Sequence, residues 1–206
     1  MDTDTTTRAA NAPASSWRTI DLMTTAVIGV VFGVAYWGWS SGYTAIDTAA
    51  PTLGAAKGLL GGPWLIAGVV AGLVIRRPGA AVTAETLAAA VSGIIGTQWG
   101  ATVLLSGLLQ GLGVELALAL FLFRNYGVWV AALSGVLAAG FEMLYEWDLY
   151  WMEMSTSWKL AYFGCFALSG AVVAGVGGWL LTRALAASGA IDALPAGREA
   201  AEGRAD

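Results

Sequence analysis

The sequence contains no histidine and a single cysteine, and only 12% of its 206 residues are charged. Without histidine, the chain can assemble neither a Ser-His-Asp triad nor the usual zinc and copper ligand sets. The lone Cys165 excludes a disulfide within one chain. The sequence has no Gly-Lys-Ser/Thr phosphate-binding loop and no basic patch, which argues against ATP hydrolysis and nucleic-acid binding by this chain. We therefore expect no cofactor, no metal site and no nucleic-acid partner.

Apolar residues, by contrast, are abundant. Hydrophobic residues make up 57% of the chain and the mean hydropathy is +0.69. Soluble domains contain about 45–50% apolar and roughly 25% charged residues, because a soluble fold must cover its surface with polar groups. The 28 glycines fit a membrane protein, since small residues let membrane helices approach closely. The composition therefore predicts an integral membrane protein.

Six apolar stretches approach the length needed to cross a hydrocarbon core of about 30 Å. They cover residues 22–39, 57–75, 79–96, 101–123, 128–145 and 158–185. The second stretch contains a Gly-Gly-Pro breaker, so its helix is expected to begin at Pro63 or Trp64. The prediction is an all-α integral membrane protein with six transmembrane helices in residues 20–186 and disordered cytoplasmic tails at 1–19 and 187–206.

The basic residues give these helices an orientation. If both termini are cytoplasmic, all eight arginines lie in cytoplasmic segments and both lysines, Lys57 and Lys159, lie in outer loops. The arginines are Arg8, Arg18, Arg76, Arg77, Arg124, Arg183, Arg198 and Arg204. This is the distribution that the positive-inside rule describes, and a helix count wrong by one would place arginines on both sides. The sequence thus predicts a multi-pass plasma-membrane protein with cytoplasmic N- and C-termini.

Tryptophan and tyrosine are distributed unevenly between the two sides. Most lie near the predicted outer ends of the helices: Tyr36, Trp37, Trp39, Tyr43, Trp64, Trp99, Tyr145, Trp147, Tyr150, Trp151, Trp158 and Tyr162. The inner side has Trp17, Tyr126, Trp129 and Trp179. An aromatic belt at the headgroup level is one explanation, but belts form at both interfaces. The uneven distribution favours an aromatic binding site that opens outward.

Polar side chains at membrane depth are costly, which makes each a candidate for function. Glu142 and Glu146 are one helical turn apart near the outer end of the fifth stretch, so they share a face. Glu115 lies well inside the fourth stretch. Gln98 lies in the tight outer turn before it, where a turn role is the alternative.

The carboxylates also have structural interpretations. Glu142 and Glu146 could be interfacial groups paired with Lys159. Glu115 could be bonded to another helix, or protonated, because burial raises the pKa of a carboxyl group. Glu85 lies near the two arginines of the preceding loop, and we expect it to be a cap that reaches the membrane surface.

Carboxylates beside Trp and Tyr rings suit a flat ligand that carries a cation or an amine. Ring faces attract a cation, and a desolvated pair is worth about 2 kcal/mol. Amide and carboxylate side chains can then bond the donors of a heterocycle. No side chain has the setting of an activated nucleophile, so this chemistry suits binding and transport and we do not expect an enzyme.

Four motifs together resemble a known family. They are Val-Val-Phe-Gly-Val at 30–34 followed by Trp37-Gly38-Trp39, Ile-Arg-Arg-Pro-Gly-Ala-Ala at 75–81, Gln98-Trp99-Gly100, and Gly-Leu-Leu-Gln-Gly-Leu-Gly-Val-Glu-Leu at 107–116. The combination, within residues 20–185, resembles the YkoE-type S components of energy-coupling-factor (ECF) ABC transporters. These are substrate-binding subunits for thiamine or its hydroxymethylpyrimidine precursor.

The resemblance implies six helices with both ends in the cytoplasm and a vitamin pocket that opens outward. It also implies association with a transmembrane coupling protein and a pair of ATPases. Gly29 and Gly33 match the small residues that contact the coupling protein in this family. Together with the aromatic and acidic pattern, the motifs give these candidate substrate-binding residues: Trp37, Gln98, Trp99, Gln110, Glu115, Glu142, Tyr145, Glu146 and Trp158.

Several alternatives remain open from the sequence. It does not separate thiamine from hydroxymethylpyrimidine or from another small heterocyclic vitamin. An intramembrane enzyme that modifies a lipid is a second class, with Glu142 and Glu146 as its nearest approach to a catalytic cluster. A purely structural assembly subunit, in which the aromatic residues form only a belt, is a third.

Overall fold

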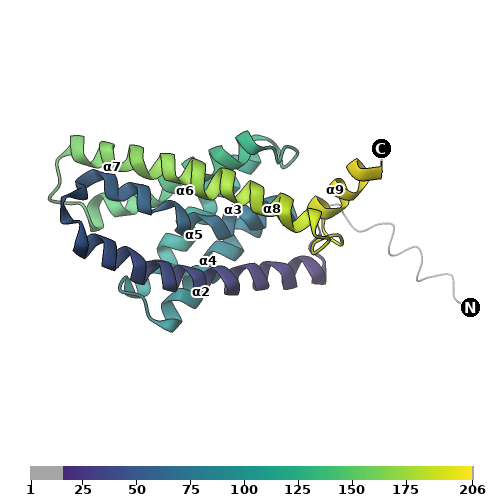
Figure 1. The fold of residues 1–206 in the computed structure, drawn as a ribbon, viewed down its shortest axis with the longest axis horizontal. Coiled ribbons are helices and arrows are strands. Elements are labelled where there is room, and N and C mark those ends of the chain that lie inside the picture. The colour runs from purple at the N-terminus through teal and green to yellow at the C-terminus, as the bar shows by residue number, and fades with distance from the viewer. Residues whose placement is uncertain (1–15, 206) are drawn as a thin grey trace, which may run out of the picture.

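The computed structural model describes residues 16–205, with side chains as far as residue 203. In this range the regular structure is helical throughout (Figure 1). The elements are α2 (Thr19–Ala49), η1 (Pro51–Leu60), η2 (Gly62–Leu65), α3 (Ile66–Ile75), α4 (Ala80–Ile95), η3 (Gly100–Thr102), α5 (Val103–Leu120), α6 (Val128–Leu149), α7 (Thr156–Ser169), η4 (Gly170–Val176), α8 (Gly177–Ala187) and α9 (Pro195–Ala205). The predicted all-α membrane class is confirmed.

Five helical stretches are long and apolar enough to cross a membrane. They are Thr19–Ala49, Pro51–Ile75, Gly100–Leu120, Val128–Leu149 and Thr156–Ala187. The sixth predicted crossing corresponds to α4, an apolar helix of 16 residues, somewhat shorter than the roughly 20 residues of a typical span. The count of six transmembrane helices and the orientation of the termini stay predictions.

Helix α2 is longer than its apolar stretch of 22–39 predicts. It begins earlier because Asp21 accepts the backbone N–H of Arg18 at 3.0 Å, which satisfies a donor at the helix start. It continues to Ala49 through a polar segment in which the hydroxyl groups of Thr44 and Thr48 donate to carbonyls four residues earlier. Hydropathy alone ends the helix where its polar residues begin, although its hydrogen bonds continue.

The second stretch begins with 3₁₀-helical turns. It becomes an α-helix only at Ile66, later than the predicted Pro63 or Trp64. From Ala67 to Ile75 every residue is buried. A helix that is apolar on all sides belongs in the interior of a bundle, and α3 accordingly lies inside the other helices (Figure 1).

Helices α2 and α4 lie against each other through two glycines. A Cβ atom on Gly29 would lie 2.7 Å from Leu87, and one on Gly33 would lie 2.5 Å from Val91 Cβ. The expected contact of these glycines with a coupling protein stays a prediction. They are buried inside this chain, where the absence of a side chain lets two helices approach closely.

The last stretch crosses as one continuous helical run, α7–η4–α8, whose middle seven residues have π-helical hydrogen bonding. There the backbones of Gly170 and Gly135 of α6 are so close that neither could carry a Cβ. This contact fixes the run against α6, since any side chain would push the two helices apart.

The C-terminal segment differs from the disordered tail predicted for 187–206. After α8 the chain turns back, and helix α9 packs near the end of α3. Ile191 and Leu194 are buried in a cluster with Val70 and Val74, and these two apolar anchors in an otherwise polar tail are the physical reason for its order. Of the predicted N-terminal tail, residues 1–15, including Arg8, lie outside the described residues, as does the side chain of Arg204.

The two ends of the bundle differ in chemistry. The start of α2 and helix α9 lie at the same end (Figure 1). There Arg18 and Arg77 approach the buried Asp21, and Arg76 pairs with Glu199 of α9. Most of the aromatic residues and three glutamates lie around a cavity toward the other end.

Candidate functional site: an aromatic cavity with buried carboxylates

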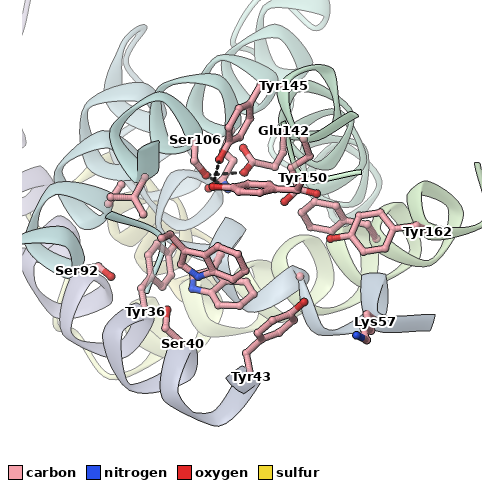
Figure 2. A pocket seen from close by; sticks show the side chains of 18 of the residues that line it. Tyr36, Ser40, Tyr43, Lys57, Ser92, Ser106, Glu142, Tyr145, Tyr150 and Tyr162 are labelled. Carbon is pink, nitrogen blue, oxygen red and sulfur yellow. Dashed lines mark hydrogen bonds between the residues drawn. The ribbon is translucent and has the colours of Figure 1, made fainter. Parts of the chain in front are cut away.

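A cavity of about 320 Å³ lies between α2, α4, α5, α6 and α7. This volume falls at the small end of ligand pockets, which span about 300–1,000 Å³. Figure 2 shows Tyr36, Ser40 and Tyr43 on one side of the cavity and Glu142 and Tyr145 on the other. Five helices far apart in the sequence therefore contribute to one site.

The α2 wall is built by helical periodicity. Tyr36, Ser40 and Tyr43 are spaced i, i+4 and i+7, so they lie on one face. All three are buried, and the Tyr36 hydroxyl accepts the backbone N–H of Ala67 at 2.9 Å. That bond ties the wall to the start of α3. The face continues the stripe that carries Gly33, so the packing against α4 also aims these tyrosines inward.

Trp99 is the centre of the first aromatic group. Its ring centroid lies 5.7 Å from that of Tyr43, 5.5 Å from Tyr150 and 6.4 Å from Trp64. Edge-to-face and tilted pairs at these separations are favourable beyond the area they bury. Tyr150 is held in turn by a 2.9 Å hydrogen bond with Thr102. The group forms a continuous aromatic surface from α2 to the end of α6.

A second aromatic group lies on the α7 side. Trp151 and Tyr162 line the cavity with ring centroids 4.9 Å apart. Trp158 stacks on Tyr162 almost in parallel, with an interplanar angle of 8°. Trp158 therefore supports a lining residue without lining the cavity itself.

Glu142 is the most constrained polar group of the site. It is buried, and its Oε1 accepts the Ser106 hydroxyl at 2.7 Å. Gln110 donates in turn to that hydroxyl at 2.8 Å. Within residues 16–205 the second oxygen of Glu142, Oε2, has no hydrogen-bond partner. A buried acceptor without a partner is costly, so this oxygen is a candidate contact for a ligand donor.

Two further glutamates line the cavity. Glu146, one turn after Glu142, accepts the indole N–H of Trp151 at 3.1 Å. Glu85 of α4 is buried and accepts the backbone N–H of Gly68 at 2.6 Å. Its other oxygen, Oε1, has no hydrogen-bond partner in the described part of the chain. Two of the three glutamates that line the cavity thus have an oxygen without a partner in the described part of the chain, which favours a ligand with N–H donors.

One ion pair lies among the lining residues. Lys57 of η1 pairs with Asp47 near the end of α2. Because Lys57 is occupied by Asp47, it does not neutralise the three glutamates. The three glutamates therefore have no basic partner among the described residues.

Five of the nine predicted substrate residues line this cavity: Trp99, Gln110, Glu142, Tyr145 and Glu146. The sequence placed Trp99, Glu142, Tyr145 and Glu146 toward a common outer side, and the structure brings these four together with Gln110. The Tyr145 hydroxyl lies 3.3 Å from that of Tyr150.

The other four candidates lie elsewhere. Trp37 is 41% exposed on the outer face of α2, one position away from the inward stripe. The Gln98 side chain donates to the Ser40 carbonyl at 3.2 Å and so holds the outer turn against α2. Glu115 accepts the backbone N–H of Ala81 at 2.9 Å, which makes it a cap for the start of α4. Trp158 supports Tyr162 from behind, as described above.

Two further sequence interpretations need correction. Glu85 is not a cap that reaches the membrane surface, because it is buried and lines the cavity. Lys159 is not the partner of Glu142 or Glu146. Its ammonium donates to the Trp147 carbonyl at 2.9 Å and lies 4.9 Å from the Trp147 ring centroid.

The nine named substrate residues did not include Ser40 or Glu85, nor Tyr36 and Tyr43, which the sequence counted only among the outer aromatic residues. The three residues of α2 among them carry a signal that was available, since they continue the i, i+4 stripe of Gly29 and Gly33 along α2. No comparable pattern in the sequence pointed to Glu85, because its position near two arginines suggested a role at the membrane interface.

Comparisons with known proteins find a matching family model, a similar sequence and a similar solved structure. Residues 20–141 match the family model described as the permease component of the ABC-type cobalt transport system. The chain is 29% identical over 188 residues to the putative HMP/thiamine permease protein YkoE of Bacillus subtilis, covering 89% of this chain and 92% of that protein. It also superimposes on a crystal structure of an S component of an ECF transporter with a TM-score of 0.86. The sequence identity to it is 28%, with 92% of this chain and 95% of the other covered.

Proposed function

The chain belongs to the family of ABC-type cobalt transport system permease components, and from this premise we propose that it binds thiamine or hydroxymethylpyrimidine for uptake. It is a multi-pass protein of the plasma membrane with the fold of an ECF S component. The relatives that it matches are transport components. The proposal adds the ligand and assigns it to the aromatic cavity.

The observation that carries the proposal is the free Oε2 of Glu142, buried inside an aromatic cavity. An aminopyrimidine, the ring that thiamine and hydroxymethylpyrimidine share, has an exocyclic amine that can donate to such an oxygen. Its flat ring suits a cavity lined by the rings of Trp99, Trp151 and Tyr162. Ser106 and Gln110 hold the carboxylate in place, so it is preorganised for this donor.

The word cobalt in the family description raises the alternative of a metal ion as cargo. Divalent transition metals are bound by imidazole, thiolate or grouped carboxylates. No cluster of three His, Cys, Asp or Glu side chains suited to a metal occurs among residues 16–205. The cavity instead presents eight aromatic side chains of Tyr and Trp around separated glutamates. This lining supports an organic ligand.

Thiamine is the preferred ligand of the two. It has a fixed positive charge on its thiazolium ring, which the uncompensated glutamates and the ring faces would both attract. Hydroxymethylpyrimidine carries only the aminopyrimidine part and would depend on stacking and hydrogen bonds. Delivery into the cell would require the coupling protein and ATPases with which ECF S components work.

Calorimetry and tryptophan fluorescence of the purified chain test the proposal. Ten tryptophans are present, and three of them line the cavity, so bound thiamine should quench the emission. Binding of thiamine at least tenfold tighter than hydroxymethylpyrimidine is expected. If neither compound changes the fluorescence, the heat signal or the melting temperature, the assignment of this ligand class is wrong.

A further inference from the structure

A second cavity lies at the opposite, arginine-rich end of the bundle. It has a volume of about 1100 Å³ and is bounded by the ends of α3 and α8, by α9 and by the loop between α5 and α6. Three arginines line it, namely Arg76, Arg124 and Arg183, against a single carboxylate, Glu199. The function proposed above uses none of these residues.

Two of these arginines are held over aromatic rings. The guanidinium carbon of Arg76 lies 4.3 Å from the Tyr126 ring centroid, and that of Arg183 lies 4.8 Å from the Trp179 ring centroid. Burial raises the pKa of the Tyr126 phenol, so its ring stays neutral. Cation–π contacts of this kind fix a guanidinium group without using its N–H donors. Among the described residues the donors of Arg183 remain available to an oxyanion, whereas Arg76 also donates its Nε–H to the Leu73 carbonyl at 3.2 Å.

The charges of this cavity are incompletely paired. Arg76 forms an ion pair with Glu199 of α9. In the portion of the chain that the structure covers, neither Arg124 nor Arg183 forms an ion pair. Arg124 and Arg183 therefore line the cavity without an acidic partner, and Arg76 is paired with its one acidic side chain, Glu199. This excess of positive charge favours the binding of anions in the cavity.

Exposed apolar side chains lie next to the unpaired arginines. Leu120 and Leu122, which are 63% and 70% exposed, come just before Arg124. Leu180 is 55% exposed, one turn before Arg183. Arg124 follows the apolar span Gly100–Leu120, and Arg183 lies about one turn before the end of the span Thr156–Ala187. Both arginines are thus near span ends, where lipid headgroups begin. The surface thus offers cations at headgroup level and apolar side chains toward the bilayer core, which matches a phospholipid and not a soluble anion.

We propose that this cavity binds the headgroup phosphate of an anionic phospholipid, with Arg124 and Arg183 as its ligands and Glu199 of α9 as a competitor for Arg76. Basic pockets between membrane helices recognise anionic headgroups in this way. Because the Glu199 carboxylate forms an ion pair with Arg76, helix α9 limits how strongly the site binds lipid. This inference does not depend on the identity of the transported ligand.

Native mass spectrometry and thermal melting of the full chain test this site. The probes are palmitoyl-oleoyl phosphatidylglycerol, the matching phosphatidylcholine, and soluble glycerol 3-phosphate. We expect phosphatidylglycerol to bind at least fivefold more tightly than phosphatidylcholine. We also expect it to raise the melting temperature more than phosphatidylcholine does. Equal effects of the two lipids would overturn the proposal, and so would binding of glycerol 3-phosphate as tight as that of the lipid.

Three single variants and one control test the location of the site. Arg124→Gln and Arg183→Gln should each weaken phosphatidylglycerol binding at least threefold. Arg198→Gln is the matched control, because Arg198 has the same charge and lies on α9 but does not line the cavity. Glu199→Gln should strengthen binding, since it releases Arg76. Circular dichroism checks that each variant keeps its helices. If all four variants bind the lipid as the unmodified chain does, the site is not where we place it.

Discussion

The hydroxyl of Ser106 on α5 donates to Oε1 of Glu142 on α6 at 2.7 Å and leaves Oε2 without a partner in the described part of the chain. One oxygen is thus fixed by the protein, and the other is buried without a bond in a residue that lines the cavity. We propose that a carboxylate held in this way is preorganised for a ligand donor.

Glu142→Gln should weaken thiamine binding by about 1.5–3 kcal/mol, the usual range for a hydrogen bond to a charged group. This corresponds to more than tenfold in Kd and is measured by calorimetry. Glu115→Gln is the control. Its side chain caps α4 away from the cavity, so it should lower the melting temperature and leave the affinity unchanged. A larger loss of affinity in Glu115→Gln than in Glu142→Gln would contradict our assignment of the site.

Trp99→Leu should weaken thiamine binding by roughly 1–2 kcal/mol, because the ring supplies both stacking and attraction for the cation. Trp37→Leu removes an indole that is 41% exposed outside the cavity, and its affinity should equal that of the unmodified chain. Fluorescence titrations of both variants provide the comparison. If Trp37→Leu weakens binding as strongly as Trp99→Leu does, the face of α2 that we place toward lipid contributes to the site.

Gly33→Ala should destabilise the protein by about 1–3 kcal/mol, the usual cost of overpacking. The added methyl would lie 2.5 Å from Val91 Cβ and 2.8 Å from the Ala88 carbonyl oxygen. Gly38→Ala provides a matched control on the same helix, since a Cβ there has no neighbour within 4 Å among the described residues. Thermal melting in detergent distinguishes them. Equal melting temperatures would show that α2 and α4 can separate without cost.

The orientation of the termini can be tested with single cysteines in a Cys165→Ala background. Glu153→Cys lies in the loop after α6, and Arg198→Cys lies on α9. A membrane-impermeant maleimide added to intact cells should label Glu153→Cys at once. It should label Arg198→Cys only after the membrane is permeabilised. The reverse pattern would refute the orientation that the arginine distribution predicts.

Much of the architecture is determined by the sequence itself. The excess of apolar residues requires lipid as solvent, and the breaker Pro78 marks the boundary between the second and third apolar stretches. The same properties gathered Trp99, Glu142 and Glu146 on one side. These conclusions follow from local properties, since hydropathy and helix length act on consecutive residues. They needed no knowledge of which helices are neighbours.

The tertiary structure decided which side chains face inward. Trp37 and Tyr36 are adjacent in sequence, but helical geometry turns Trp37 outward and buries Tyr36 in the cavity. Glu115 was expected in the binding site and Glu85 at the membrane surface, but Glu115 caps α4 and Glu85 lines the cavity. The partner of Glu115 is the start of α4, and that of Glu85 is the backbone of α3, at separations of 34 and 17 residues. Because contacts between helices depend on packing across the whole bundle, no local pattern in the sequence could assign them.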